Sequence, residues 1–289
     1  MYTLFFDTDC DITPEIANRY GAKLISMPYT VNGKEIKPYV DYEKYDAHEL
    51  NELMRKGVVP TTSALSPEDY KQYFEPEFKA GRDILYVHFS AVMSATFNSL
   101  RLALEDLKEI YPDRKADLID TKGITLGSLS LCMSMGQLYK EGKTVEEIKK
   151  WAEENVDKQA FYFFADNLKF FAKSGRVGGF SAFMGGMFGI KPIIYIGNDG
   201  KMTSIGKAKG RKGALQTILN YVIELEDHIK DYPVIIAHGD AMYLVDEFIP
   251  MLKKQFGEDL EVMVEDVNPT AVSHCGPDTL GITFHAKHR

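Results

Sequence analysis

Short apolar runs alternate along the chain with longer segments in which apolar residues recur every three or four positions. The short runs predict buried strands at residues 2–6, 84–88, 117–119, 161–164, 192–196, 234–237, 260–264 and 281–285. The periodic segments predict amphipathic helices at residues 13–21, 95–110, 125–139, 144–156, 211–230 and 241–256, with another that begins at residue 66. Because strands and helices alternate, the pattern predicts the α/β fold class.

Capping residues mark where several of these helices begin and end. Thr13 and Ser66 each precede a proline, an arrangement typical of an N-cap followed by a first-turn proline. Thr144 and Glu147 form a capping box, and Gly21 closes the first helix. The helix boundaries are therefore better defined than hydrophobic periodicity alone would make them.

The composition of the chain changes near residue 158. Six glycines occupy the fifteen residues from 175 to 189, with phenylalanine and methionine between them. We therefore predict two α/β domains, formed by residues 1–157 and 158–289. The first carries most of the polar loops, and the cleft between the two domains is the expected ligand site.

Composition and charge exclude several classes of protein. With 289 residues, 45% of them apolar and 26% charged, the chain has the composition of a folded globular protein. A net charge of −8 makes nucleic acid a poor partner. The chain lacks a run of about eighteen apolar residues, so we predict no integral membrane segment. Three widely spaced cysteines and a start unlike a signal peptide predict a cytoplasmic protein.

Three aspartates at alternate positions, Asp7, Asp9 and Asp11, follow the first strand. One interpretation is a metal-dependent phosphatase with Asp7 as nucleophile and Asp9 as acid or base, similar to the haloacid dehalogenase pattern. The later acidic residues of that pattern, Asp240 among them, stand at unusual spacing. The interpretation that we favour is a helix entry in which Asp11 or Thr13 caps backbone amides, with no metal site.

Hydroxyl-bearing residues gather in two further loops. If Ser66 caps its helix, Thr62 and Ser63 are left to bind an anion with their hydroxyl groups. Ser94 and Thr96 stand at the start of a later helix, where capping explains one hydroxyl but not both. Both loops therefore qualify as parts of an anion site.

Two more segments carry candidate chemistry. His274 and Cys275 would point apart in an extended segment, which argues against a Cys–His dyad. Basic residues cluster at 173–176 and 207–212. In an acidic protein such patches indicate a docking surface or a phosphate contact, or else a solvated loop.

Taken in order, these segments resemble the DegV family of bacterial fatty-acid-binding proteins. Residues 6–12 are similar to the family's opening Asp-Ser/Thr segment, residues 61–67 to its Thr-Ser-Gln-Pro-Ser motif, and residues 89–99 to its serine-rich stretch. Asp120-Thr121, the Leu168 to Val177 region, the Lys191 to Lys212 region and His274-Cys275-Gly276-Pro277 follow in the family's order. The resemblance covers about the whole chain, and the order of the motifs makes it specific.

The resemblance implies two α/β domains with a long-chain fatty acid between or beneath them. It implies that the carboxylate is bound by Thr62, Ser63, Ser94 and His274, with Asp7 and Thr96 in a supporting shell. Family members present the fatty acid to a separate fatty acid kinase, which forms an acyl phosphate, and Arg176 matches the arginine that docks this partner. The resemblance thus implies a carrier without catalytic residues of its own and without a cofactor.

A fatty acid also needs a long apolar tunnel. The expected wall consists of Phe161, Phe163, Phe171, Phe183 and Met187. Burial of about fifteen methylenes at roughly 0.8 kcal/mol each contributes near 12 kcal/mol before the costs of binding are subtracted. We therefore expect the acyl chain to dominate affinity and the head group to set orientation. A metal-dependent phosphatase and a non-catalytic lipid or small-molecule sensor are the alternatives.

Overall fold

The computed structural model describes residues 1–178 and 189–289, and their strands form three sheets. A parallel four-stranded sheet has the order β2-β1-β6-β7, with β1 at Tyr2–Asp7, β2 at Lys23–Ile25, β6 at Asp83–His88 and β7 at Ala116–Asp120. A small antiparallel sheet has the order β4-β3-β5, with β3 at Tyr29–Val31, β4 at Lys34–Ile36 and β5 at Thr61–Thr62.

The third sheet is mixed and contains seven strands within the described residues, in the order β13-β12-β14-β8-β10-β11-β9. Their bounds are β8 at Gln159–Phe164, β9 at Val177–Gly178, β10 at Ile190–Ile196, β11 at Met202–Lys209, β12 at Val234–His238, β13 at Val262–Asp266 and β14 at Leu280–His285. The predicted α/β fold class is confirmed.

Ten α-helices accompany these sheets in the part of the chain that the structure describes. They are α1 at Pro14–Tyr20, α2 at Ala47–Arg55, α3 at Pro67–Lys79, α4 at Thr96–Ile110, α5 at Leu126–Lys140, α6 at Val145–Asn155, α7 at Leu168–Ser174, α8 at Gly210–Leu225, α9 at Met242–Phe256 and α10 at Pro269–Cys275. Within that same part, no helix combines the length and the apolar character that a membrane crossing requires.

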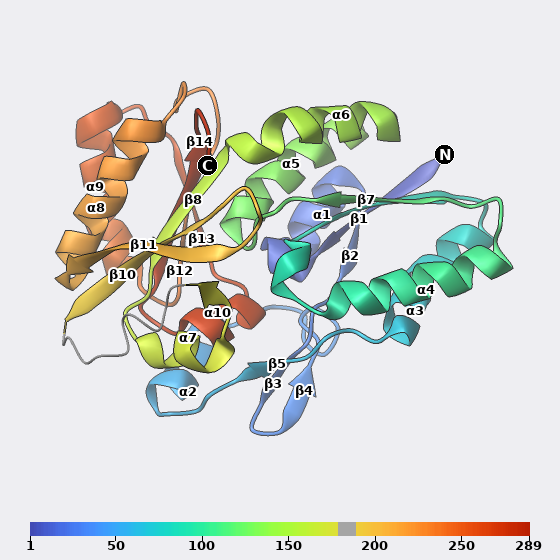
Figure 1. The fold of residues 1–289 in the computed structure, drawn as a ribbon, viewed down its shortest axis with the longest axis horizontal. Helices are drawn as coiled ribbons and strands as arrows, with labels where there is room; N and C mark the ends of the chain where they lie inside the picture. The colour runs from blue at the N-terminus through green and yellow to red at the C-terminus, as the bar shows by residue number, and fades with distance from the viewer. Residues whose placement is uncertain (179–188) are drawn as a thin grey trace.

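Strand β8 shows how the large sheet is buried on both faces. Tyr162 and Phe164 pack into one hydrophobic cluster with residues of α8 and α9, which flank this sheet in Figure 1. Phe161 and Phe163 face the other way and join the cluster that contains the N-terminal sheet. Successive strand residues point to opposite faces of the sheet, so the residues of β8 pack alternately into two hydrophobic cores. Helix α5 contacts both β1 and β8, so it lies between the two sheets.

The parallel sheet brings three loops to one edge. The carboxyl ends of β1, β6 and β7 are adjacent, since His88 pairs with Asp120 and β1 pairs with β6. The backbone N–H of Ser90 donates to Gly123 O at 2.7 Å, which fastens the loop after β6 to the loop after β7. Figure 1 shows α2, β5, α7 and α10 gathered below this region. Polar loops from both halves of the chain therefore meet there.

The capping predictions are confirmed, and the end of one helix differs from expectation. Thr13 and Thr144 accept hydrogen bonds from the helices that they precede, and Ser66 forms a capping box with Asp69. Helix α8 ends at Leu225 instead of residue 230, because Glu226 is extended and pairs with the C-terminal segment. The division of the chain at residues 157 and 158 stays a prediction.

The extended conformation predicted around His274 is wrong. This residue lies in the last turn of α10, whose N-cap Asn268 accepts a hydrogen bond from Ala271 N. Asn268 followed by Pro269 is a helix-start signal that the sequence already contains.

Candidate functional site

Two adjoining chambers lie where the two halves of the chain meet. The polar chamber has about 510 Å³ of space free of protein atoms, part of it open to solvent, and its polar lining includes Asp9, Thr62, Ser63, Ser94, Thr96 and Arg176. The apolar chamber has about 470 Å³ of such space, and its lining includes Phe161, Phe163, Phe171, Val267 and Cys275. Four residues line both chambers: Ile124, Met202, Ala271 and His274.

His274 marks the boundary between the two chambers. Its Nε2 atom lies 3.0 Å from Thr62 Oγ1. Thr62 is held by β5, where it pairs with Tyr29 of β3, and His274 is held by α10. Burial, reinforced by the charge of Arg176, lowers the pKa of His274 to about 4. The imidazole is therefore neutral at neutral pH, so one ring nitrogen donates a hydrogen bond and the other accepts one.

The start of α4 contributes two more hydroxyl groups. Ser94 Oγ accepts from Thr96 N at 3.2 Å. Thr96 Oγ1 accepts from Leu65 N at 3.1 Å and lies 3.0 Å from the Tyr70 hydroxyl. Thr96 therefore fastens the loop after β5 to α3 and α4, while the Ser94 hydroxyl hydrogen has no partner among these contacts.

Ser63 lies in the wall of the polar chamber, but its hydroxyl donates to Glu35 Oε2 at 2.6 Å. This contact turns the Ser63 hydroxyl toward β4. The sequence thus predicted that Ser63 belongs to the polar site, but it did not reveal that Glu35 of β4 is the partner of its hydroxyl group.

Asp7 lies behind the chambers and lines neither of them. Its carboxylate accepts hydrogen bonds from Tyr86 Oη at 2.9 Å, Phe89 N at 3.3 Å and Cys10 N at 3.1 Å. Burial still raises the pKa of Asp7 to about 6, because the lost hydration outweighs these bonds.

This arrangement gives the phosphatase interpretation no geometric support. A nucleophile must reach a substrate, and the Asp7 side chain is enclosed. Asp11 instead accepts from Asn268 N at 3.1 Å and from Asn268 Nδ2 at 2.7 Å, so neighbouring aspartates turn to different partners. In residues 1–178 and 189–289 no three His, Cys, Asp or Glu side chains converge as metal ligands would.

Small residues make room for the aromatic wall of the apolar chamber. Phe161 and Phe163 stack with ring centroids 5.2 Å apart. A Cβ atom on Gly281 would lie 2.7 Å from Phe161 Cε2 and 2.9 Å from Phe163 Cβ, so this strand position needs glycine. Burial raises the pKa of Cys275 to about 12, which keeps its thiol protonated and unreactive.

The structure brings together most of the residues singled out from the sequence. Arg176, expected at a docking surface, is exposed and also lines the polar chamber. Two of the expected tunnel residues, Phe183 and Met187, lie outside the described residues. Sequence reasoning missed Ile124 and Met202, which line both chambers and belong to no polar motif.

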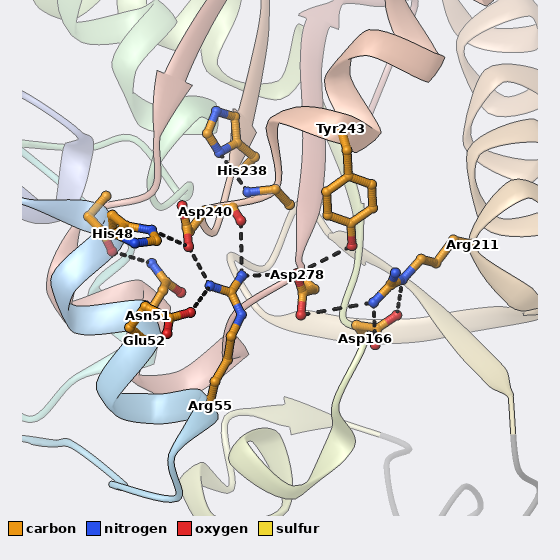
Figure 2. Close-up of polar contacts among 12 residues, drawn as sticks. His48, Asn51, Glu52, Arg55, Asp166, Arg211, His238, Asp240, Tyr243 and Asp278 are labelled. Atoms are coloured by element: carbon orange, nitrogen blue, oxygen red, sulfur yellow. Dashed lines mark hydrogen bonds and ion pairs between the residues drawn. The ribbon is translucent and has the colours of Figure 1, made fainter.

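A network of charges joins α2 to the C-terminal half of the chain beside the site (Figure 2). Arg55 contacts the Asp240 carboxylate, and its Nη2 atom donates at 3.0 Å to both Asp240 O and Asp278 Oδ1. Arg211 lies 3.9 Å from Asp278 Oδ2 and donates to Asp166 Oδ1 at 2.8 Å. We call these five residues the Arg55 clasp.

The Arg55 clasp joins a segment next to Thr62 in the chain to a segment next to His274. Arg55 ends the helix that leads into β5 and Thr62, while Asp278 follows the helix that carries His274. The clasp therefore fixes how these two segments lie against each other.

Comparisons with known proteins agree with one another. The model of a family described as "Uncharacterised protein, DegV family" matches residues 2–287. A DegV domain-containing protein of Clostridium perfringens is 29% identical over 286 residues, which cover 98% of this chain and 97% of that protein. A solved fatty-acid-binding DegV family protein from Thermus thermophilus has a TM-score of 0.85 and 24% identity, with 99% of each chain covered.

A solved stearic acid-binding protein from Eubacterium ventriosum is also similar, with a TM-score of 0.84, 20% identity and 99% of each chain covered. At such identities the solved structures establish the fold, which consists of two α/β domains. The family match extends over nearly the entire sequence, from residue 2 to residue 287. The chain belongs to the DegV family.

Proposed function

We propose that this protein binds a long-chain fatty acid, with the carboxyl group in the polar chamber and the acyl chain in the apolar chamber. The observation that carries the proposal is the junction at His274, which lines both chambers. A fatty acid has the same division, with one polar end joined to a long apolar chain. The fatty-acid-binding relatives from Thermus thermophilus and Eubacterium ventriosum support this assignment.

In this proposal hydroxyl groups and one neutral imidazole bind the carboxylate. Thr62, Ser94 and His274 bind it: Ser94 donates its hydroxyl hydrogen, and the Thr62–His274 pair donates the one hydrogen that its mutual bond leaves over. Ser63 lies beside them. Asp7 and Thr96 support the loops from behind. Since about fifteen methylenes at roughly 0.8 kcal/mol each outweigh a few hydrogen bonds, the apolar chamber sets most of the affinity.

Mass spectrometry tests the binding proposal. We expect native spectra of the purified protein to carry an additional mass, and organic extraction to release about one fatty acid per chain. Ser94→Ala should lower the retained amount, whereas Ser134→Ala, whose hydroxyl bonds Ser130 O within α5, should not. A protein that purifies empty and takes up no added fatty acid would overturn the proposal.

We further propose that the protein is a carrier and not an enzyme, and that it presents the carboxyl group to a separate fatty acid kinase for acyl-phosphate formation. Arg176 supports this proposal, because it is exposed and lines the chamber assigned to the carboxyl group. We place this carrier in the cytoplasm, where its three buried cysteines stay reduced.

The kinase proposal is tested with the purified partner enzyme. Arg176→Ala should weaken kinase binding and acyl-phosphate formation more than it weakens fatty acid binding. Lys143→Ala is the control, because Lys143 is an exposed cation that pairs with Glu147, lies outside the basic cluster 173–176 and lines neither chamber. Unchanged kinase affinity in Arg176→Ala would refute the docking role.

A further inference from the structure

Asp9 brings a carboxyl group into the wall of the polar chamber, beside Thr62, Ser94 and His274. It lies in the short helical turn Thr8–Cys10 directly after β1, and it is buried. A negative charge at this position would repel the carboxylate that the proposed function assigns to the same chamber. The ionisation state of Asp9 therefore bears directly on whether the chamber accepts an anion.

The hydrogen bonds around Asp9 contain one more acceptor than the available hydrogens can serve. Asp9 Oδ1 contacts Thr270 Oγ1, which also lies 2.5 Å from Asn268 Oδ1. Asn268 Oδ1 is an acceptor, because Asn268 Nδ2 donates to Asp11 Oδ1 and because Ala271 N donates to Asn268 Oδ1.

The single hydroxyl hydrogen of Thr270 cannot serve both contacts. If Thr270 donates to Asn268, then Asp9 must supply the hydrogen of the contact that joins it to Thr270. A protonated Asp9 thus completes the chain of three oxygens, whereas an ionised Asp9 leaves one oxygen pair without a hydrogen.

The negative charges near Asp9 act in the same direction, whereas Arg176, a cation in the wall of the same chamber, acts against them. The titratable groups that face it are Asp7 and Asp11 from its own segment, Tyr70 from α3, His274 from α10 and Arg176 from the segment before β9. Burial is the main reason that the pKa of Asp9 rises to about 8. The charge of Asp7 raises this pKa further, and the hydrogen bond between Asp9 and Thr270 lowers it. His274 is neutral, so it adds no positive charge that would favour an ionised Asp9.

We propose that Asp9 is held as a neutral carboxylic acid and that its proton allows the polar chamber to accept an ionised fatty acid. This inference rests on the proposed function and adds a regulation to it. The proton bonds Asp9 to Thr270 and removes a negative charge from the chamber wall. Ionisation of Asp9 reverses both effects, so the affinity for a carboxylate falls as the solution becomes alkaline.

The test measures laurate affinity at about pH 6.5 and about pH 9 by calorimetry. Laurate is ionised at both values, since a carboxyl group in water titrates near pH 4.3. With a pKa of about 8, the protonated fraction of Asp9 falls about tenfold between these conditions, and the apparent affinity of the wild-type protein should fall by a similar factor. Asp9→Asn cannot ionise, so its two affinities should agree within about twofold.

Asp117→Asn is the control, because Asp117 pairs with Lys149 and lines neither the polar nor the apolar chamber. It should retain the wild-type pH dependence. A second measurement reads the proton directly: the infrared difference between wild-type protein and Asp9→Asn should contain the band of a protonated carboxyl group near neutral pH.

The possible failures are distinguishable. If Asp9→Asn keeps the wild-type pH dependence, or if the difference spectrum contains no band of a protonated carboxyl group, the Asp9 inference is wrong while fatty acid binding stands. If neither protein binds laurate or longer fatty acids at any pH, both the inference and the proposed function fail.

Discussion

Thr62 and His274 are separated by 212 positions in the sequence, yet Thr62 Oγ1 lies 3.0 Å from His274 Nε2. The threonine comes from a short edge strand, and the histidine comes from the last turn of a helix in the other half of the chain. Their contact closes the polar chamber at the place where it meets the apolar chamber. A hydrogen bond at this position couples the two halves of the site.

Removal of either partner should weaken fatty acid binding. Thr62→Val and His274→Gln should each lower the affinity roughly fivefold, which corresponds to about 1 kcal/mol for one hydrogen bond. In a double-mutant cycle the two losses should not add, because both remove the same contact. Thr217→Val, which breaks a bond to Gly213 O within α8, is the control. Additive losses would show that the two side chains act independently.

Loss of the Arg55 clasp should loosen this contact from a distance. Arg55→Gln leaves Asp240 and Asp278 without their shared cation, so we expect a loss of about 1–2 kcal/mol in the free energy of unfolding, together with weaker fatty acid binding. Arg101→Gln breaks an exposed pair with Glu105 and should change both quantities little. Urea unfolding and calorimetry provide the two measurements. Equal effects of the two variants would rule out a special role for the clasp.

Glu77 should make the protein sensitive to acid. Its buried carboxylate accepts from Arg82 Nε at 2.6 Å and from Thr3 Oγ1 at 2.5 Å, and it also contacts Lys23. The bond from Arg82 is the main reason that its pKa falls from 4.5 to about 2. Because the folded-state pKa is the lower one, this stabilisation is complete above about pH 4.5 and disappears as the pH falls toward 2.

The shift at Glu77 corresponds to roughly 3 kcal/mol at most. Urea unfolding at a series of pH values measures it. Glu77→Gln should be less stable than the wild-type protein at neutral pH and should lose less stability between about pH 4.5 and about pH 2. An identical acid dependence in both proteins would contradict the assignment.

Two helical glycines should respond in opposite ways to alanine. A Cβ atom on Gly136 of α5 would lie 2.6 Å from Tyr20 Cγ, so Gly136→Ala should force α1 and α5 apart and cost about 1–3 kcal/mol. On Gly213 of α8 the nearest atom would be Ala208 Cβ at 3.7 Å. Gly213→Ala should therefore be neutral or stabilising by up to about 1 kcal/mol. Thermal unfolding distinguishes the two, and a stable Gly136→Ala would show that Tyr20 can move aside.

The regular elements could be predicted because their causes are local. Thr13, Ser66 and Thr144 cap helices through hydrogen bonds to residues only three positions away. The strands β3, β4 and β5 of the small sheet went unpredicted, since runs of two or three residues are too short to show an alternating pattern. Helix α10 was also missed, although its Asn-Pro start is visible in the sequence.

By itself, the sequence determined the α/β class, the starts of the capped helices α1, α3 and α6, and the family, because each depends on neighbouring residues or on an ordered series of short motifs. Tertiary structure alone decided that Thr62 meets His274, that Arg55 joins Asp240 and Asp278, and that Ile124 and Met202 connect the two chambers. Such contacts depend on how whole elements pack, and residues far apart in a sequence carry no local pattern that reports their distance in space.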